Sequence, residues 1–177
     1  MNEKIVISYF KTPVGELILG SFQDKLCLAD WRYRKMRESI DSRIKKGLQT
    51  DFEEGRGEVI EEAINQLNQY FNKERTEFDI SLLFVGTDFQ KQVWDSLIKI
   101  PFGETNSYLE LSKTLGNEKA IRAVATANGA NAISILVPCH RIIGSDGSLT
   151  GYAGGLPAKK KLLELEGAMD NGQLELF

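Results

Sequence analysis

Apolar and polar residues alternate in several short runs over the first 31 positions, the pattern of strands with one buried face. The alternating apolar positions are Ile5, Ile7 and Tyr9, then Leu17 and Leu19, then Leu26 and Leu28. Turn-forming residues separate these runs at 12–15 and 23–25. The pattern therefore predicts three short strands joined by tight turns.

Two helices are predicted after these strands. Residues 33–46 are charged and helix-prone, and Gly47 is a plausible C-cap. Residues 57–72 place one apolar stripe on a helical face, formed by Val59, Ala63, Leu67, Tyr70 and Phe71. The composition of 50–57 is that of a loop, and 78–84 could add a strand. Residues 1–85 are thus predicted to form a small α/β domain.

A mostly helical pattern begins at residue 86. Thr87 or Asp88 can cap a helix that Pro101 and Gly103 stop. Its apolar positions are Phe89, Val93, Leu97 and Ile100. Pro157 suits the first turn of a last helix at 158–166, after a glycine-rich loop at 144–155. We therefore expect a second domain over 86–169 and an α+β fold overall.

Two short helices lie inside this second domain. Ser107 can cap a helix at 108–115, and Asn117 can cap the next one at 118–127. Gly116 lies between them, so the pair has the form of a helix-turn-helix. At 100° per residue the second helix turns Ile121, Val124 and Ala125 inward, and it turns outward Lys119, Arg122, Ala123 and Thr126. Short side chains around two cations would let the helix backbone approach a nucleic acid closely, although an ordinary solvated face has the same composition.

Charge and composition restrict the functions open to the chain. The formal net charge is −3 and the pI is about 5.4, so any contact with nucleic acid must be local. No apolar run is long enough to cross a membrane, and the N-terminus does not read as a signal peptide, so we expect a cytoplasmic protein. Two cysteines and one histidine cannot build a disulfide framework or a Cys/His zinc site. We expect no metal and no cofactor, and we interpret Cys27 as a core residue.

The dipeptide Cys139-His140 is the candidate for chemistry. A cysteine is nucleophilic as a thiolate, and an adjacent base can help to form it. Neighbouring side chains in a strand point to opposite faces, so the strand-like run 135–138 must end at Pro138 and turn if the two are to cooperate. Glu164 and Glu166 are the candidates for an acid that orients the imidazole. A buried thiol beside a surface imidazole is the simpler interpretation of the dipeptide alone.

A set of ordered blocks over 86–167 resembles the O6-alkylguanine-DNA alkyltransferases. The blocks are Gly86-Thr87-x-Phe89-Gln90-x-x-Val93-Trp94, Ile100-Pro101-Phe102-Gly103-Glu104-Thr105 with Ser107-Tyr108, Arg122-Ala123-Val124, Pro138-Cys139-His140-Arg141, Gly151-Tyr152-x-Gly154-Gly155 and Leu162-Leu163-x-x-Glu166-Gly167. The first 85 residues match in layout only. The resemblance implies a ribonuclease-H-like N-terminal domain and a winged-helix-like C-terminal domain with a helix-turn-helix.

The resemblance also implies a single-use reaction by a monomer. Cys139 would accept an alkyl group from O6-alkylguanine, His140 would draw the thiol proton through a water, and Glu166 would orient the imidazole. A thioether is a poor leaving group, so the protein would not turn over. Asn131 would tie the helix-turn-helix to the active-site turn, with Ala132 in a place where the family usually has proline. Some members carry zinc in the N-terminal domain, but this chain lacks the histidines for it.

Double-stranded DNA containing O6-alkylguanine is the implied substrate, with O4-alkylthymine as a further candidate. The target oxygen lies in the base stack, so the nucleotide must be flipped out. Helix 118–127 would enter the minor groove, and Arg122 would fill the gap that the base leaves. Tyr108 would crowd the target phosphate and hydrogen-bond the guanine. The base pocket would be lined by backbone groups of Cys139, Ile142 and Ala153 and by the ring of Tyr152.

The C-terminal tail, 170–177, resembles a different kind of binding element. Its last five residues are similar to the peptide with which many bacterial DNA-processing proteins bind the sliding clamp of the replicase; the implied contacts are Gln173, Leu174, Leu176 and Phe177. Two other functions stay open from the residues alone. One is a non-catalytic DNA-binding relative; such relatives lack the acceptor cysteine, so the presence of Cys139 argues against this function. The other is a thiol hydrolase or redox enzyme, which would turn over many times.

Overall fold

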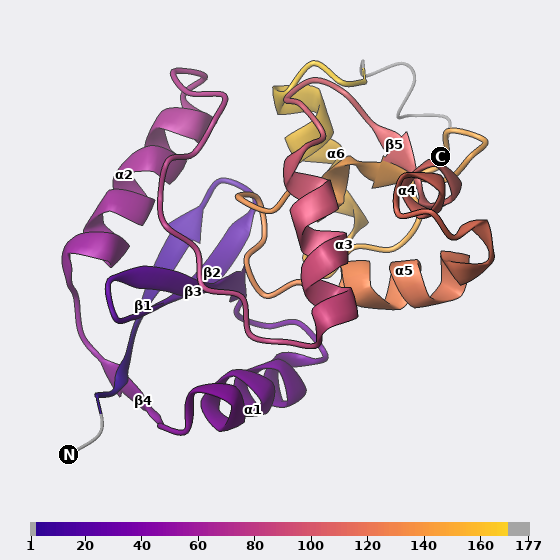
Figure 1. Cartoon of the computed structure of the whole chain (residues 1–177). Coiled ribbons are helices and arrows are strands. Elements are labelled where there is room, and N and C mark those ends of the chain that lie inside the picture. Colours follow the sequence, from indigo (N-terminus) through magenta and orange to yellow (C-terminus); the bar gives the residue numbers. More distant parts are fainter. Residues whose placement is uncertain (1–2, 170–177) are drawn as a thin grey trace. The chain divides into compact units, whose positions relative to one another are not determined.

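The computed structural model describes residues 3–169, which form two compact units that divide between Gly86 and Thr87 (Figure 1). The predicted clamp-binding peptide and the tail that carries it lie outside the described residues. Within those residues, no helix is both long enough and apolar enough to cross a membrane.

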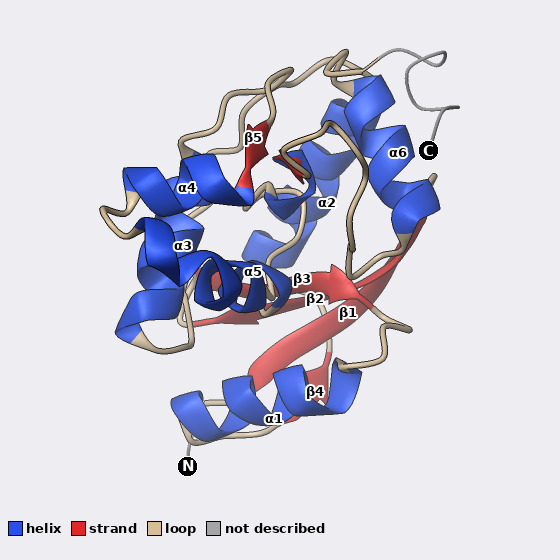
Figure 2. Ribbon diagram, turned by 90° about the vertical axis from the view of Figure 1, so that its right-hand side faces the viewer, coloured by secondary structure: helices blue, strands red, loops and turns tan. Residues whose placement is uncertain are grey.

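The first unit is built on a four-stranded sheet in the order β3-β2-β1-β4 (Figure 2). Strands β1 (Ile5–Thr12), β2 (Gly15–Phe22) and β3 (Lys25–Trp31) form an antiparallel meander, which confirms the three predicted strands. Gln23 and Asp24 both have positive φ, 50° and 62°, as the tight β2–β3 hairpin requires. Both predicted turns are therefore confirmed.

The fourth strand was not predicted. Strand β4 (Phe52–Glu54) pairs parallel with β1 inside the segment whose composition indicated a loop. The predicted strand at 78–84 was wrong, because this segment forms one isolated bridge, between Leu26 and Leu82. Two of the three residues of β4 are glutamates, so the strand has no apolar pattern that sequence analysis could detect. It forms because the edge of β1 offers unpaired backbone groups for hydrogen bonding.

Two helices complete the first unit. Helix α1 (Arg37–Leu48) begins later than predicted, and it ends at Gln49, whose φ of 56° is left-handed. Gly47 is not the cap: a Cβ there would lie 2.4 Å from Cγ1 of Val85, so the glycine permits a close approach. Helix α2 (Glu58–Phe71) packs against β1, β2 and β3. It buries Ala63, Leu67 and Tyr70 of the predicted stripe and, beyond the prediction, Ile60 and Gln66.

The core of the first unit includes both faces of the central strands. Leu17, Ile18 and Leu19 of β2 are all buried, and so is every residue from Leu26 to Trp31. Cys27 is buried as predicted, and its thiol donates to the carbonyl of Gly20 at 3.6 Å. Burial raises the pKa of Cys27 to about 12, so this thiol is not a nucleophile at neutral pH.

Four α-helices and a two-stranded parallel pair make up the described part of the second unit. Helix α3 (Asp88–Ile98) packs against α4 (Tyr108–Thr114) and α5 (Ile121–Gly129), and α6 (Leu156–Leu165) follows the glycine-rich loop (Figure 2). Strand β5 (Asn106–Ser107) pairs with β6 (Ile142–Ile143). Capping boxes begin α3 and α4, with Thr87 and Ser107 as the predicted N-caps.

The second helix of the predicted helix-turn-helix begins as a 3₁₀ turn, Glu118–Ala120, capped by Asn117, and continues as α5. The buried stripe of α5 is Val124, Ala127 and Asn128. Ile121 was predicted to face inward, but 38% of it is exposed. A helical side chain leans toward the N-terminus, so Ile121, the first residue of α5, projects beyond the packed turn.

Candidate active site

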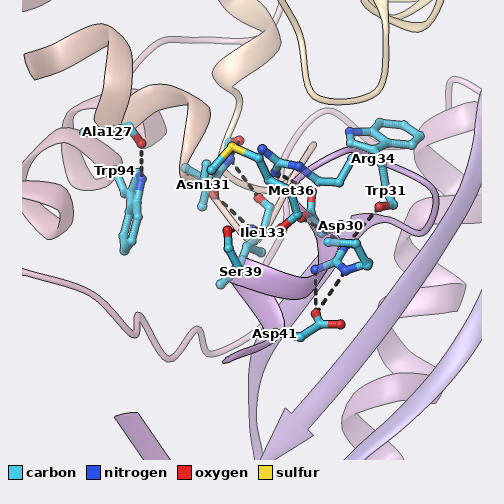
Figure 3. A network of polar contacts seen from close by, with 12 residues as sticks. Asp30, Trp31, Arg34, Met36, Ser39, Asp41, Trp94, Ala127, Asn131 and Ile133 are labelled. Carbon is cyan, nitrogen blue, oxygen red and sulfur yellow. Dashed lines mark hydrogen bonds and ion pairs between the residues drawn. The ribbon is translucent and has the colours of Figure 1, made fainter. Parts of the chain in front are cut away.

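The segment before Cys139 is a tight turn held by one asparagine. The side chain of Asn131 donates to the carbonyl of Val137 at 2.9 Å and accepts from the backbone N–H of Ile133 at 2.9 Å (Figure 3). Ile135 has a φ of 71°, a left-handed conformation that is rare for a β-branched residue. The predicted strand at 135–138 was therefore wrong. The amide of Asn131 satisfies backbone groups of this turn without a proline at Ala132.

The chain turns after Pro138 into a 3₁₀ turn, Cys139–Arg141, that buries all three side chains. The Nε2 atom of His140 lies 2.7 Å from Oε2 of Glu166, directly after α6. Of the two candidate acids, the structure thus brings Glu166 to the imidazole. Glu164 is directed elsewhere, with Lys160 at 4.0 Å.

Arg141 is the second partner of this carboxylate. Its Nε atom donates to Oε1 of Glu166 at 2.8 Å, its Nη2 atom donates to Oε2 at 3.0 Å, and its Nη1 atom donates to the carbonyl of Ile100 at 2.6 Å. A bidentate guanidinium fixes a carboxylate in position as well as in charge. Arg141 therefore holds Glu166 in place for His140.

The protonation states at this site follow from burial and pairing. Burial lowers the pKa of His140, although Glu166 opposes the shift, so the imidazole is neutral at pH 7. Burial raises the pKa of Glu166, but His140 and Arg141 lower it further, to about 2. An ionised Glu166 accepts a hydrogen bond from Nε2–H of His140, which leaves Nδ1 of His140 as the basic nitrogen. Nδ1 is buried and has no hydrogen-bond partner within residues 3–169, so it is available to take a proton.

Glu166→Gln is expected to remove part of the acid sensitivity of the fold. The folded-state pKa of Glu166 is lowered from 4.5 to about 2, so its contribution is complete above pH 4.5 and is lost as the pH falls toward 2. This linkage corresponds to about 3 kcal/mol of unfolding free energy at neutral pH, and about 2 kcal/mol of it is lost by about pH 3. Urea unfolding of both proteins at these two pH values measures the difference. A difference in unfolding free energy between the two proteins that does not change with pH would contradict the lowered pKa of Glu166. Glu164→Gln is the control.

Tyr108 is half-buried at the first position of α4, and it belongs to the surroundings of Cys139. Burial raises its pKa, hydrogen bonds with the side chains of Thr150 and Asn128 oppose the shift, and the charge of Cys139 adds to it. Sequence reasoning missed Thr150 and Asn128. The one available signal was a polar residue, Asn128, four positions after Val124 on the buried stripe of α5.

Of the predicted pocket residues, Ile142 directly follows the turn that carries Cys139, and Tyr152 contacts His140. Ile142 is buried in β6 directly after the 3₁₀ turn, and Tyr152 and Ala153 are half-buried in the glycine-rich loop. The ring of Tyr152 meets the ring of His140 edge-on, with centroids 6.4 Å apart. The described residues contain no cluster of three or more side chains that could hold a metal ion.

The predicted nucleic-acid face lies exposed on the second helix of the helix-turn-helix. Lys119, Arg122, Ala123 and Thr126 are all exposed, as the periodicity predicted. The hydroxyl of Thr126 donates to the carbonyl of Arg122 at 3.0 Å. Helix α5 is held from behind by Trp94 of α3, whose Nε1 atom donates to the carbonyl of Ala127 at 2.9 Å (Figure 3).

Two family models match nearly the whole chain. Residues 5–84 match the ribonuclease-like domain of 6-O-methylguanine DNA methyltransferase, and residues 88–168 match its DNA-binding domain. These matches confirm the predicted α+β order of a ribonuclease-like unit followed by a helical DNA-binding unit.

Individual relatives agree with the family models. The chain is 43% identical over 160 residues to a methylated-DNA–protein-cysteine methyltransferase of Methanosarcina acetivorans, covering 90% of this chain and 96% of that one. It is 43% identical over 169 residues to the same protein of Mycobacterium leprae, covering 94% of each. Among solved structures it resembles Mycobacterium tuberculosis OGT in complex with DNA, with a TM-score of 0.80, 40% identity and coverage of 96% and 94%.

Proposed function

Because the chain belongs to the 6-O-methylguanine DNA methyltransferase family, we propose that Cys139 is the residue that receives the alkyl group. The chain reverses O6-alkylguanine damage directly, by transfer to its own cysteine. Cys27 is unsuited to this role, because its thiol is held in the protonated form in a strand. The observation that carries the proposal is the hydrogen bond between buried His140 and Glu166, directly beside Cys139.

The geometry supports a proton transfer followed by a displacement. Nδ1 of His140 takes the thiol proton of Cys139, through a water molecule, and Glu166 stabilises the imidazolium that results. The sulfur then attacks the alkyl carbon, a C–S bond forms, and the electrons of the C–O bond go to O6 of the guanine. The leaving guanine takes up a proton from the hydroxyl of Tyr108, and the proton held by His140 returns to Tyr108 through solvent, so that the net transfer is of the thiol proton to the guanine. The product thioether is neutral and stable, so each molecule reacts once.

DNA binding through a local surface fits the acidic chain. The M. tuberculosis relative has been crystallised with DNA, and we propose that this chain presents α5 to the minor groove. Arg122 replaces the extruded base in the stack, Lys119 contacts phosphate, and Ala123 and Thr126 let the backbone approach closely. Tyr108 crowds the target phosphate, and the flipped base enters a pocket lined by Ile142, Tyr152 and Ala153. One chain supplies all of these residues, which supports action as a monomer.

Mass spectrometry after incubation with a methylated duplex tests the proposal. We expect one methyl group per protein molecule, on the peptide that contains Cys139, and no further demethylation once the protein is used up. A thiol hydrolase would instead release product many times without a lasting adduct. An unmodified Cys139 peptide in a folded sample that has demethylated the DNA would exclude this cysteine as the acceptor.

The sequence of the C-terminal tail indicates one further binding partner. We propose that Gln173, Leu174, Leu176 and Phe177 bind the sliding clamp of a replicase, on the resemblance of the peptide alone. A pull-down of the clamp by the full chain and by a chain lacking 173–177 tests this. Equal capture of the clamp by both chains would contradict this proposal.

A further inference from the structure

The segment between α3 and β5 contains the family block 100–105, to which the proposed alkyl transfer assigns no role. The backbone N–H of Glu104 donates to the carbonyl of Pro101 at 3.1 Å, which closes a four-residue turn. Gly103 is the third residue of this turn, and its φ of 85° is close to the value that a type II turn requires there. The turn therefore explains the glycine, and the contacts of the turn indicate what it does.

Three contacts join this turn to Glu166 and Arg141. A Cβ atom on Gly103 would lie 3.2 Å from the backbone carbonyl oxygen of Glu166, so the two backbones approach closely. The Nη1 atom of Arg141 donates to the carbonyl of Ile100 at 2.6 Å. The guanidinium carbon of Arg141 lies 5.9 Å from the centroid of the Phe102 ring, which is a cation–π contact. The turn thus contacts Glu166 directly and also through Arg141.

These contacts hold Glu166 at both of its ends. Its backbone caps the C-terminal end of α6, where Gly103 lies against it, and its carboxylate accepts two hydrogen bonds from Arg141. Arg141 and Ile100 are buried, so water does not replace a hydrogen bond that the guanidinium loses. The carbonyl of Ile100 therefore limits where the guanidinium can lie, and the guanidinium limits where the carboxylate can lie.

We propose that the turn at 101–104 sets the position of Glu166 and, through it, the orientation of the His140 imidazole, so that Gly103 and Phe102 are positioning residues of the alkyl transfer. This inference rests on the proposed function, in which His140 is the base for Cys139. The distance from Nε2 of His140 to Oε2 of Glu166 is 2.7 Å, and a side chain on Gly103 would displace Glu166 by a few tenths of an ångström. A displacement of that size weakens a short, well-aligned hydrogen bond.

Gly103→Ala tests the contact with Glu166, and Gly116→Ala is its matched control. Gly116 has a similar φ of 78°, but a Cβ atom there would meet no atom of the described residues within 4 Å. Both substitutions introduce the same kind of backbone strain, so each should lower Tm by about 2–8 °C. Gly103→Ala should also slow the reaction with free O6-benzylguanine about tenfold, and Gly116→Ala should leave that rate within about twofold.

The imidazole gives a second readout, because His140 is the one histidine of the chain. Labelling with ¹⁵N-histidine therefore reports the ring nitrogens of this residue alone. In wild-type protein at pH 7 we expect Nε2 to carry the proton and its N–H signal to lie far downfield, because the hydrogen bond to the carboxylate is short. Gly103→Ala should move this signal upfield, and Gly116→Ala should leave it in place. A merely structural turn would lower Tm without moving the signal.

Equal slowing of the reaction in both glycine variants would overturn the proposal, and so would an imidazole signal that is the same in Gly103→Ala and in wild type. If Gly103→Ala does not fold, Phe102→Leu decides instead. Removal of the ring from Arg141 should move the same signal, and an unchanged signal overturns the proposal. If wild-type protein forms no adduct with free O6-benzylguanine, the proposed function fails, while the imidazole signals still decide whether the turn positions Glu166.

Discussion

Cys139→Ser is expected to abolish alkyl transfer and to leave the fold and DNA binding in place. The serine hydroxyl is nearly isosteric with the thiol, but His140 cannot ionise an alcohol to a useful extent, and oxygen is a weaker nucleophile toward an alkyl carbon. The rate of methyl transfer from a methylated duplex should fall on the order of 10⁴-fold or more. Transfer of a radiolabelled methyl group measures the loss, and a gel-shift titration with the same duplex measures binding.

Cys27→Ala is the matched control for this substitution. Cys27 is the other cysteine of the chain, and its thiol is buried in β3 with a pKa of about 12. Loss of its sulfur should cost some stability through the small cavity and the lost bond to Gly20, but the final yield should stay at one methyl group per molecule. Residual transfer by the Cys139→Ser protein would place the acceptor elsewhere.

Local signals in the sequence predicted most of the fold. The strand alternation, the hairpin turns and the caps at Thr87, Ser107 and Asn117 depend on neighbouring residues, and all of them are observed. The errors concern tertiary contacts. Strand β4 exists because β1 offers it a backbone edge, and Gly47 serves the approach of Val85 rather than a helix end. Neither partner could be identified from residues nearby in sequence.

In the candidate site, too, some features follow from neighbouring residues and others depend on tertiary contacts. The dipeptide Cys139-His140 indicates a nucleophile and a base from the sequence. Local sequence did not show whether Glu164 or Glu166 orients the imidazole. The choice depends on how the end of α6 meets the 3₁₀ turn, where Arg141 and His140 both reach Glu166. The place of Gly103 beside Glu166 could not be predicted either, because it depends on a contact between distant segments of the chain.

Arg122→Ala is expected to separate DNA repair from the chemistry of the thiol. Arg122 is exposed on α5, and it is not among the hydrogen-bonding partners of Cys139, His140 or Glu166 within the described residues, so its loss should leave the reaction with free O6-benzylguanine within about twofold. In a duplex the flipped state loses the side chain that occupies the gap in the stack. Unstacking a base costs a few kcal/mol, so a loss of about 2 kcal/mol, roughly 30-fold in the single-turnover rate, is expected on methylated duplex. Lys99→Ala, at the exposed end of α3, removes a charge of the same sign and should change neither rate by more than about twofold. Equal slowing on the duplex and on the free base would mean that Arg122 supports the active site itself, and the proposed minor-groove role of α5 would have to be abandoned.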